Sequence, residues 1–555
     1  RYALGQFSDE GHCFATREQL VTSAAKVLET SRQACEAQLT VLIQQEALIA
    51  VQNEMSSPAG AAHGLSSNGQ AAVYLPPFYY AEQGVAGKIA RMLYSPGPDR
   101  LAVFSDVDWE RAFTWLDGRI PFRLSEQQWD AVQMTLTQKV SILTGGPGTG
   151  KSTITAAIIH LLRAKHRSVL LTAPTGRAAK RLSEATGLEA STIHRLLEFT
   201  PGAGNVFLRD RENPLDADMI IVDEASMIDI LLMNHLLKAV DVGTHLLLVG
   251  DVDQLPSVGP GNVLRDMIES EGDRTACDLQ LPLTYNGGLI PVTRLDIIFR
   301  QAADSFIVVN AHRINQGKMP LISKQARDFF LFREPDPERA ADLILDIVAR
   351  RIPAKFGYQA DRDIQVLSPM HRGPAGVGVL NRRLQACLNS SEVGKPEWKL
   401  GQRVFRVGDR VMQIRNNYDK QVFNGDMGRI RDIDQDAHTL VVDFEGLPID
   451  YEFSQLDELV HAYAVSVHKA QGSEFPVVVM PILTQHYVLL QRNLLYTGIT
   501  RARELVVLVG SKRALAIAVH NEKIAHRNTH LADALRTKAL QLSEAQNPSV
   551  GFYDV

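Results

Sequence analysis

The chain has 555 residues, of which 45% are hydrophobic and 22% are charged, and this composition is ordinary for a soluble globular protein. Its length predicts about three or four domains. The net charge of −5 does not indicate a broadly basic nucleic-acid-binding surface, and no apolar run is long enough to span a bilayer. Four scattered cysteines without a C-x-x-C pair argue against a cysteine metal site and favour a reducing, cytoplasmic location.

Residues 1–120 are predicted to form a mainly helical N-terminal domain. Apolar spacing favours helices at about 16–31 and 33–51, and residues 71–93 are predicted to hold a short strand pair followed by a helix. This region shows no recognisable chemistry. Because the chain begins with Arg1 rather than Met, we expect it to lack an N-terminal part.

Residues 121–300 alternate apolar strand runs with helical segments, which is typical of a parallel sheet covered by helices on both faces. The strand runs are "VSILTG", "SVLLTAP", "MIIVDE" and "HLLLVGD". Residues 196–210 interrupt this alternation with two short apolar runs around the turn sequence "PGAGN". That interruption predicts an inserted β-hairpin.

A second α/β domain is predicted at 301–398 and 454–525, where "DIQVLSP", "VVVMPIL" and "ELVVLVG" are further buried-strand runs. Between its two parts, residues 399–453 carry short strands joined by Gly, Asn and Asp turns, which predicts a small inserted β-barrel. Residues 526–555 are expected to be a C-terminal tail. The predicted fold class is therefore α/β, with two parallel-sheet domains, a hairpin, a barrel and a mainly helical N-terminal domain.

A glycine-rich run, "GGPGTGKST", directly follows the first strand run and precedes a helix. It matches the pattern G-x-x-x-x-G-K-[ST], in which backbone N–H groups and a helix N-terminus surround a phosphate. Lys151 would reach the β- and γ-phosphates, and the Ser152 hydroxyl would bind Mg²⁺. We therefore expect ATP and Mg²⁺ as cofactors, held by the loop residues Gly145, Gly146, Pro147, Gly148, Thr149, Gly150, Lys151, Ser152 and Thr153.

Two carboxylates, Asp223 and Glu224, follow the buried-strand run "MIIV". Open α/β sheets bind their ligands at the carboxyl ends of the strands. Asp223 is predicted to hold Mg²⁺, and Glu224 to take a proton from the attacking water. An Asp-Glu pair alone is usually a solvated turn, but its place after a buried strand, in a chain with a phosphate loop, favours catalysis.

Only the first α/β domain carries a phosphate loop. A nucleotide held between two domains can receive a guanidinium from the opposite side in the transition state. Arg300, at the end of the first domain, and Arg501, just before a strand of the second, are the candidates. From the residues alone, a surface salt bridge is the more common role for any single arginine.

Eight short motifs occur along residues 121–520 in an order that resembles superfamily 1 helicases, and specifically the stand-alone RecD-like 5′→3′ DNA helicases of bacteria. Besides the phosphate loop, they are "LSEQQWDAV", "LTAPTGRAAKRL", "IIVDEASM", "LLLVGDVDQLPSVGPG", "DIIFRQ", "YAVSVHKAQGSEF" and "YTGITRARE". Each motif is weak by itself, and the set in this order is specific. That family also has a hairpin after "LTAPTGRAAKRL" and an SH3-like barrel before "YAVSVHKAQGSEF". The predicted hairpin at 196–210 and the predicted barrel at 399–453 fall at these two places.

The resemblance implies roles for individual residues. Gln128 would recognise adenine, Gln254 and Arg300 would contact the γ-phosphate, and Arg501 would be the arginine finger. Gly472 and Glu474 would face ATP. The residues implied at the DNA are Pro174, Thr175, Arg177, His194, His468 and Lys469.

The resemblance also implies two RecA-like domains and an ATP-dependent 5′→3′ DNA helicase of repair or recombination. Its partners would be single-stranded DNA and duplex DNA with a 5′ tail, without a membrane, and we expect a monomer. Helix-hairpin-helix repeats, which related proteins carry ahead of this region, are not recognisable. Two other functions remain open, namely an RNA helicase or remodeller and a module whose affinity for single strands is switched by nucleotide. The complete catalytic set argues against the switched module.

Overall fold

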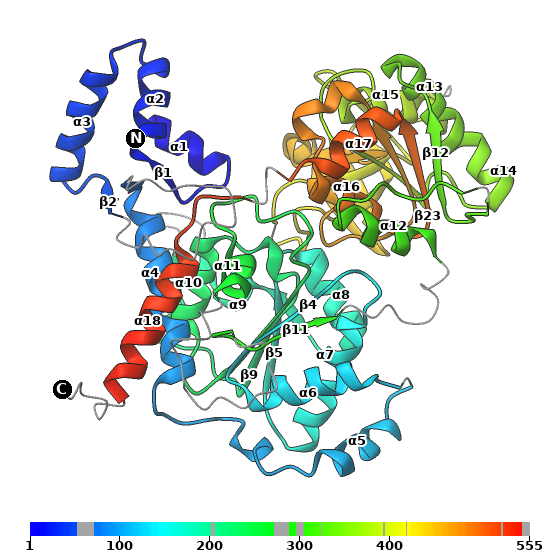
Figure 1. Ribbon diagram of the computed structural model, residues 1–555. Helices are drawn as coiled ribbons and strands as arrows, with labels where there is room; N and C mark the ends of the chain where they lie inside the picture. The colour runs from blue at the N-terminus through cyan, green and yellow to red at the C-terminus, as the bar shows by residue number, and fades with distance from the viewer. Residues whose placement is uncertain are drawn as a thin grey trace.

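Two parallel sheets with their helices form the two main bodies of the computed structural model (Figure 1). The structure describes residues 1–52, 71–121, 123–200, 206–270, 288–295, 305–323, 325–391, 395–417, 419–522 and 526–546. In Figure 1 the first body lies below and the second lies at the upper right, while helices α1–α3 of the N-terminal region stand at the upper left. The predicted α/β fold class is confirmed.

The first sheet has six parallel strands in the order β11-β4-β10-β9-β5-β6. Its strands are β4 (Val140–Gly145), β5 (Val169–Ala173), β6 (Ala190–Thr192), β9 (Met219–Val222), β10 (His245–Gly250) and β11 (Val292–Leu295). The helices of this domain are α6 (Glu126–Thr137), α7 (Lys151–Ala164), α8 (Gly176–Thr186), α9 (Ile193–Leu196), α10 (Ile230–Ala239) and α11 (Val263–Glu269). Strands β4, β9 and β10 are buried along their whole length, because helices pack on both faces of the sheet.

Two very short strands, β7 (Phe199–Thr200) and β8 (Val206–Phe207), pair antiparallel where the hairpin was predicted. The rings of Phe199 and Phe207 pack with centroids 4.9 Å apart, and Phe207 packs on His235 of α10 at 4.5 Å. This aromatic contact anchors the base of the hairpin to the first domain. Residues 201–205, which join the two strands, lie outside the described residues.

The second sheet has five parallel strands in the order β12-β23-β22-β13-β21. These are β12 (Phe329–Arg333), β13 (Ile364–Ser368), β21 (Ala464–Ser466), β22 (Phe475–Ile482) and β23 (Ala502–Gly510). Its helices are α12 (Phe306–Asn315), α13 (Pro337–Asp346), α14 (Ile352–Phe356), α15 (Val377–Leu388), α16 (Arg492–Ile499) and α17 (Lys512–His520). Two hydrophobic clusters cover the two faces of this sheet.

The insertion in the second domain is an antiparallel sheet in the order β19-β18-β17-β16-β20, preceded by a two-stranded ribbon of β14 and β15. The strands are β14 (Glu397–Leu400), β15 (Arg403–Arg406), β16 (Arg410–Gln413), β17 (Met427–Asp434), β18 (Thr439–Phe444), β19 (Leu447–Glu452) and β20 (Leu459–His461). They enclose a core that includes Phe405, Ile430 and Tyr451. The sheet continues past residue 453, the predicted end, because β20 and β21 form one apolar run that the sequence pattern does not divide.

The N-terminal region combines helices with a three-stranded antiparallel sheet in the order β1-β3-β2. Its elements are α1 (Tyr2–Asp9), β1 (Phe14–Thr16), α2 (Arg17–Val27), α3 (Arg32–Gln44), β2 (Ile49–Val51), β3 (Ala72–Tyr74), α4 (Pro76–Tyr94) and α5 (Trp109–Asp117). The second predicted helix, at 33–51, is therefore divided into α3 and the strand β2. The predicted strand pair is the single strand β3, which pairs with two strands from earlier in the chain.

The last described segment is helix α18 (Leu531–Gln546), which lies along α4 in Figure 1. Residues 526–555 were predicted to be a tail, and the structure differs because 531–546 are helical. Leu531 and Leu535 are one helical turn apart and join the core formed by Val85 and other residues of α4. The C-terminal helix therefore packs on α4 as part of the same core as the first sheet.

Candidate active site between the two domains

The phosphate loop joins the end of β4 to the start of α7 and adopts a backbone that needs glycine. Gly148 and Gly150 have φ angles of +73° and +87°, and a Cβ on Gly150 would lie 2.3 Å from the Nε2 atom of Gln128. The Lys151 ammonium donates to the carbonyl oxygens of Gly145 at 2.6 Å and Gly146 at 2.9 Å. The single cation of the loop is thus held inside the cradle by main-chain oxygens.

Gln128 is buried in the first turn of α6, where it forms a capping box with Ser125. Its Nε2 atom donates to the carbonyl of Thr149 at 3.3 Å. The side chain therefore supports the phosphate loop from behind and also lines the cavity in front of it. The adenine contact implied for Gln128 stays a prediction.

Asp223 and Glu224 follow β9 and line the same cavity as Lys151. Glu224 has a left-handed backbone with a φ angle of 51°, and its N–H donates to Asp223 Oδ1 at 2.8 Å. A non-glycine residue in this conformation is strained, and such strain concentrates at functional sites. Burial and the neighbouring Glu224 raise the pKa of Asp223 to about 6, against the opposing effect of Lys151 and Arg181. The nearby positive charges of Lys151 and Arg181 therefore do not offset the effect of burial on this carboxyl group.

Arg501 of the second domain reaches the first domain across the cleft. Its Nη2 atom donates to Gln254 Oε1 at 2.9 Å, and its side chain is only 3% exposed. Gln254 in turn donates to Asp251 Oδ2 at 2.9 Å, and Tyr496 of the second domain donates to the same oxygen at 2.9 Å. The predicted γ-phosphate sensor and arginine finger are thus joined in one buried hydrogen-bond network that links both sheets.

Glu474 of the second domain is held between two arginines. It pairs with Arg181 of α8 at 2.5 Å and with Arg503 at 2.9 Å, while Arg181 also donates to the Gly472 carbonyl at 3.2 Å. Burial acts to raise the pKa of Glu474, but the two guanidinium groups outweigh it, and the pKa is lowered. The segment around Gly472 therefore docks on the first domain through charged contacts.

These groups surround a cavity of about 1250 Å³ between the two domains. Its lining includes the phosphate loop, Asp223, Glu224, Asp251 and Gln254 from the first domain, and Glu474, Arg501 and Arg503 from the second. The volume exceeds that of common small-molecule pockets, which are about 300–1,000 Å³. The cleft is wide enough for a nucleoside triphosphate.

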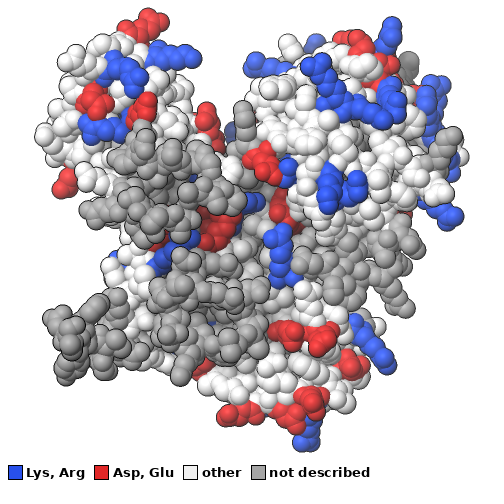
Figure 2. Space-filling view, in the orientation of Figure 1, with Lys and Arg blue, Asp and Glu red and all other residues white. Residues whose placement is uncertain are grey.

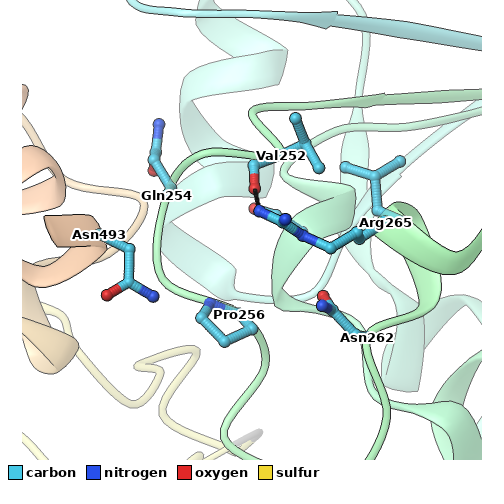
Figure 3. Close-up of a pocket in the computed structure, with 8 residues that line it drawn as sticks. Val252, Gln254, Pro256, Asn262, Arg265 and Asn493 are labelled. Atoms are coloured by element: carbon cyan, nitrogen blue, oxygen red, sulfur yellow. Dashed lines mark hydrogen bonds between the residues drawn. The ribbon is translucent and has the colours of Figure 1, made fainter. Parts of the chain in front are cut away.

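A much smaller cavity, of about 10 Å³, lies beside the cleft (Figure 3). It is bounded by residues 252–256, by α11 and by Asn493 of the second domain, and Arg265 reaches from α11 to donate to the Val252 carbonyl at 3.2 Å. This space holds about one water molecule. It cannot hold a nucleotide.

Comparisons with known proteins match three parts of the chain to family models. A model described as an AAA domain matches residues 128–260, and an ATP-dependent RecD-like DNA helicase SH3 domain matches residues 380–444. A UvrD-like helicase C-terminal domain matches residues 461–509. The last two models cover the larger part of the insertion and the segment of the second domain that contains Glu474 and Arg501.

Curated relatives match over most of the chain. The ATP-dependent RecD2 DNA helicase of Deinococcus radiodurans is 36% identical over 484 residues, which are 87% of this chain and 61% of that protein. The RecBCD enzyme subunit RecD of Mycobacterium tuberculosis is 32% identical over 476 residues, which are 80% of this chain and 77% of that protein. The chain belongs to the RecD family of helicases. It spans about three-fifths of the length of the Deinococcus relative.

Among solved structures, a crystal structure of the Pif1 helicase from Bacteroides matches with a TM-score of 0.43 at 17% identity. The match covers 78% of this chain and 98% of that one. No helix in the described part of this RecD-family chain is long and apolar enough to cross a membrane.

The residues predicted at the DNA lie on three elements, namely around the start of α8, on α9 at the base of the hairpin and on a 3₁₀ turn of the second domain. Thr175 caps the N-terminus of α8 and lies next to Pro174, and the guanidinium of Arg177 lies 5.5 Å from the ring centroid of Phe475. His194 packs on Phe199 and Phe207 at the base of the hairpin, where burial lowers its pKa. His468 and Lys469 are exposed on a short 3₁₀ turn of the second domain. Their DNA contacts stay predictions.

Arg300, the predicted γ-phosphate contact, lies outside the described residues. Sequence reasoning missed Asp251, Arg181 and Tyr496, all of which take part in the contacts around the cleft. Asp251 could have been predicted from the sequence, because it directly follows β10 just as Asp223 directly follows β9. Arg181 and Tyr496 lie on helices and carried no such signal.

Proposed function

We propose that this RecD-family chain is an ATP-dependent DNA helicase that moves 5′→3′ along single-stranded DNA and separates the duplex ahead, in repair or recombination. The observation that carries the proposal is the buried contact between Arg501 and Gln254, which connects the two domains beside Lys151, Asp223 and Glu224. Nucleotide hydrolysis at such a contact changes how the two domains sit on each other. The 5′→3′ polarity rests on the family.

The cleft residues fit Mg-ATP. Ser152 and Asp223 offer the oxygen donors that Mg²⁺ prefers, and the raised pKa of Asp223 shows a carboxylate that a divalent cation would stabilise. When bound, Mg²⁺ would neutralise charge on the β- and γ-phosphates. In the proposed reaction Lys151 holds the phosphates, Glu224 accepts a proton from the attacking water, and Arg501 stabilises the charge that develops on the transferred group.

The proposed strand path passes the junction of α8, the 3₁₀ turn of the second domain and the insertion. Arg177 has a buried Nη1 atom without a hydrogen-bond partner, and a phosphate would supply one. Lys469 also lines a cavity of about 480 Å³ between α15 and the insertion. The cationic side chains there are Arg382, Arg403, Arg406 and Lys469, and the described lining includes no carboxylate. This local positive charge suits a phosphate backbone.

On the rest of the visible surface, the distribution of charge does not indicate a path for DNA. On the face shown in Figure 2 acidic and basic side chains are interspersed, with blue groups most frequent over the second domain. This mixture agrees with the overall net charge of −5. The proposed strand path therefore rests on local contacts rather than on a basic face.

The hairpin at 196–210 would keep the separated strands apart. None of its described residues lines the ATP cavity, so hydrolysis is expected to continue without it. Each base-pair step is worth about 1.4 kcal/mol, which a motor without a wedge would have to gain from fraying. Replacing residues 199–206 with a short Gly-Ser turn should abolish unwinding while DNA-stimulated ATP hydrolysis and single-strand binding persist. Normal unwinding by this variant would show that the hairpin is an ordinary loop.

Strand displacement on partial duplexes tests the function directly. One substrate carries only a 5′ single-stranded tail and the other only a 3′ tail, and we expect ATP-dependent displacement of the first alone. Displacement from the 3′ tail would contradict the polarity. Stimulation of ATP hydrolysis by single-stranded RNA but not by DNA would identify an RNA helicase instead, and binding without any hydrolysis would identify a nucleotide-switched module.

A further inference from the structure

The loop after the γ-phosphate sensor is held by an arginine from near the C-terminal end of the described chain. Arg527 lies just before α18, and its Nη1 atom donates to the carbonyls of Gly259 at 2.8 Å and Gly261 at 2.7 Å and to Ser257 Oγ at 3.1 Å. Its Nη2 atom donates to the Ser257 carbonyl at 2.7 Å. One side chain thus makes four hydrogen bonds to a single short loop.

The same arginine is fixed from its other side by the N-terminal region. Gly11 has a φ angle of +92°, and a Cβ there would lie 2.4 Å from the Cζ atom of Arg527. Next to Arg527, the Asn528 N–H donates to His12 Nδ1 at 2.9 Å, and the Asn528 carbonyl accepts from the Cys13 N–H at 2.9 Å. The guanidinium is therefore enclosed between the N-terminal region and the loop at 257–261.

The residues just before this loop are held by the second domain. The Leu255 N–H donates to Thr497 Oγ1 at 2.9 Å, and Gln471 Nε2 donates to the Leu255 carbonyl at 3.0 Å. Gln254 accepts from Arg501. Only Pro256 separates the part held by the second domain from the part held by Arg527. The loop at 257–261 is therefore linked to the segment that carries Gln254 through this one residue.

We propose that Arg527 is a positioning residue for Gln254, and that through it the packed terminal segments set the geometry of the ATP cleft. The proposal rests on the proposed ATP hydrolysis at this cleft. Small displacements of a group that contacts the reacting phosphate lower turnover strongly, because the transition state needs near-exact alignment. They affect ATP binding little, since the phosphate loop and Lys151 supply the ground-state contacts.

The test is Arg527→Met, which keeps the length of the side chain and removes every donor. We expect kcat for single-stranded-DNA-stimulated ATP hydrolysis to fall about tenfold or more, with KM for ATP within about twofold of the wild type. Arg527→Lys retains a donor for the loop carbonyls and should recover part of the loss. Arg536→Gln is the matched control, because Arg536 lies on the same terminal segment but bonds to Asp533 and the Glu269 carbonyl instead.

Concentrations of folded protein are matched by titration with a fluorescent ADP analogue, so that a loss of fold cannot mimic a loss of kcat. Wild-type kcat in Arg527→Met, or a lysine variant no better than methionine, would overturn the proposal. If Arg527→Met does not fold, Arg527→Gln removes the guanidinium and leaves one amide donor in place of the four hydrogen bonds, and an unchanged kcat there would overturn the proposal equally. If DNA does not stimulate ATP hydrolysis by the wild-type protein, that result contradicts the helicase function but not the role of Arg527. The variants and the wild type are then compared by their basal rates of ATP hydrolysis.

Discussion

Two regions of the molecule bury carboxyl groups whose pKa values are raised, and the two regions differ in what surrounds these groups. In the ATP cleft, burial raises the pKa of Asp223 to about 6 and raises that of Asp251, and both side chains line an open cavity with Lys151. Where the two terminal segments pack, burial raises the pKa values of Glu82 and Asp266 to about 7. Neither Glu82 nor Asp266 lines the cavity between the two domains.

Nearby cations rather than hydrogen-bond partners distinguish the two regions, because in the cleft Asp251 also accepts from the neutral Gln254 and Tyr496. At the terminal junction, Glu82 accepts from the Tyr74 hydroxyl at 3.0 Å, and Asp266 accepts from the Thr529 hydroxyl at 2.8 Å. These neutral donors serve a carboxyl group in either protonation state. In the cleft, the nearby groups are the charged Lys151 and Arg181, which favour the ionised form. The difference teaches that a raised pKa marks a functional site only where the buried charge faces a cavity.

Lys151→Ala removes the cation on which the cleft depends, and we expect the largest effect of any substitution considered for this chain. Without the ammonium, the phosphate cradle retains only its backbone N–H groups, so ATP hydrolysis should fall to near background. Steady-state turnover with saturating single-stranded DNA measures this loss. Because the Lys151 ammonium is held by the loop carbonyls of Gly145 and Gly146 and belongs to no hydrophobic core, the melting temperature should change little. Turnover like that of the wild type would refute the assigned site.

Arg501→Ala tests the contribution that comes from across the cleft. An arginine that acts on charge developing in the transition state is worth about 10³–10⁵ in rate. We therefore expect kcat to fall by about 10³ or more while KM for ATP changes far less. The neighbouring Arg503→Ala is the comparison variant, because Arg503 pairs with Glu474 instead of Gln254. An effect of Arg501→Ala confined to KM would show that this arginine only holds the bound nucleotide.

Part of the cleft could be predicted from the sequence, and the terminal junction could not. The phosphate loop, Asp223 and Glu224 each stand next to a buried strand, so chain position alone predicted their chemistry. The junction joins Glu82 of α4, Asp266 of α11 and Arg527, which are far apart in the chain. The local spacing of apolar residues along the chain does not reveal contacts between segments that are far apart in sequence. The same limit explains why α18 was predicted as a tail, since only its packing on α4 shows why its apolar stripe is buried.

Glu82→Gln perturbs the terminal junction without touching the cleft. The folded pKa of Glu82, about 7, lies above its ordinary value of 4.5, so the folded protein binds this proton more tightly than the unfolded chain does. Stability from this group is therefore fully present below about pH 4.5, declines as the pH rises toward 7, and stays constant above that. A shift of this size corresponds to roughly 3 kcal/mol.

The glutamine cannot ionise, so this part of the pH dependence should vanish. Its amide can replace the carboxyl oxygen that faces Tyr74, because the Tyr74 hydroxyl can donate to His530 Nδ1, 2.7 Å away, and accept from the amide. We expect denaturant unfolding to show the variant gaining stability relative to the wild type between pH 5 and pH 8, by up to about 3 kcal/mol. Glu110→Gln, on the exposed side of α5, is the control. ATP turnover should stay within about twofold of the wild type, because Glu82 takes no part in the hydrogen bonds between Arg527 and the loop at 257–261. A stability difference that stays flat across this pH range would show that Glu82 is ionised in both states, and the contrast between the two regions would fail.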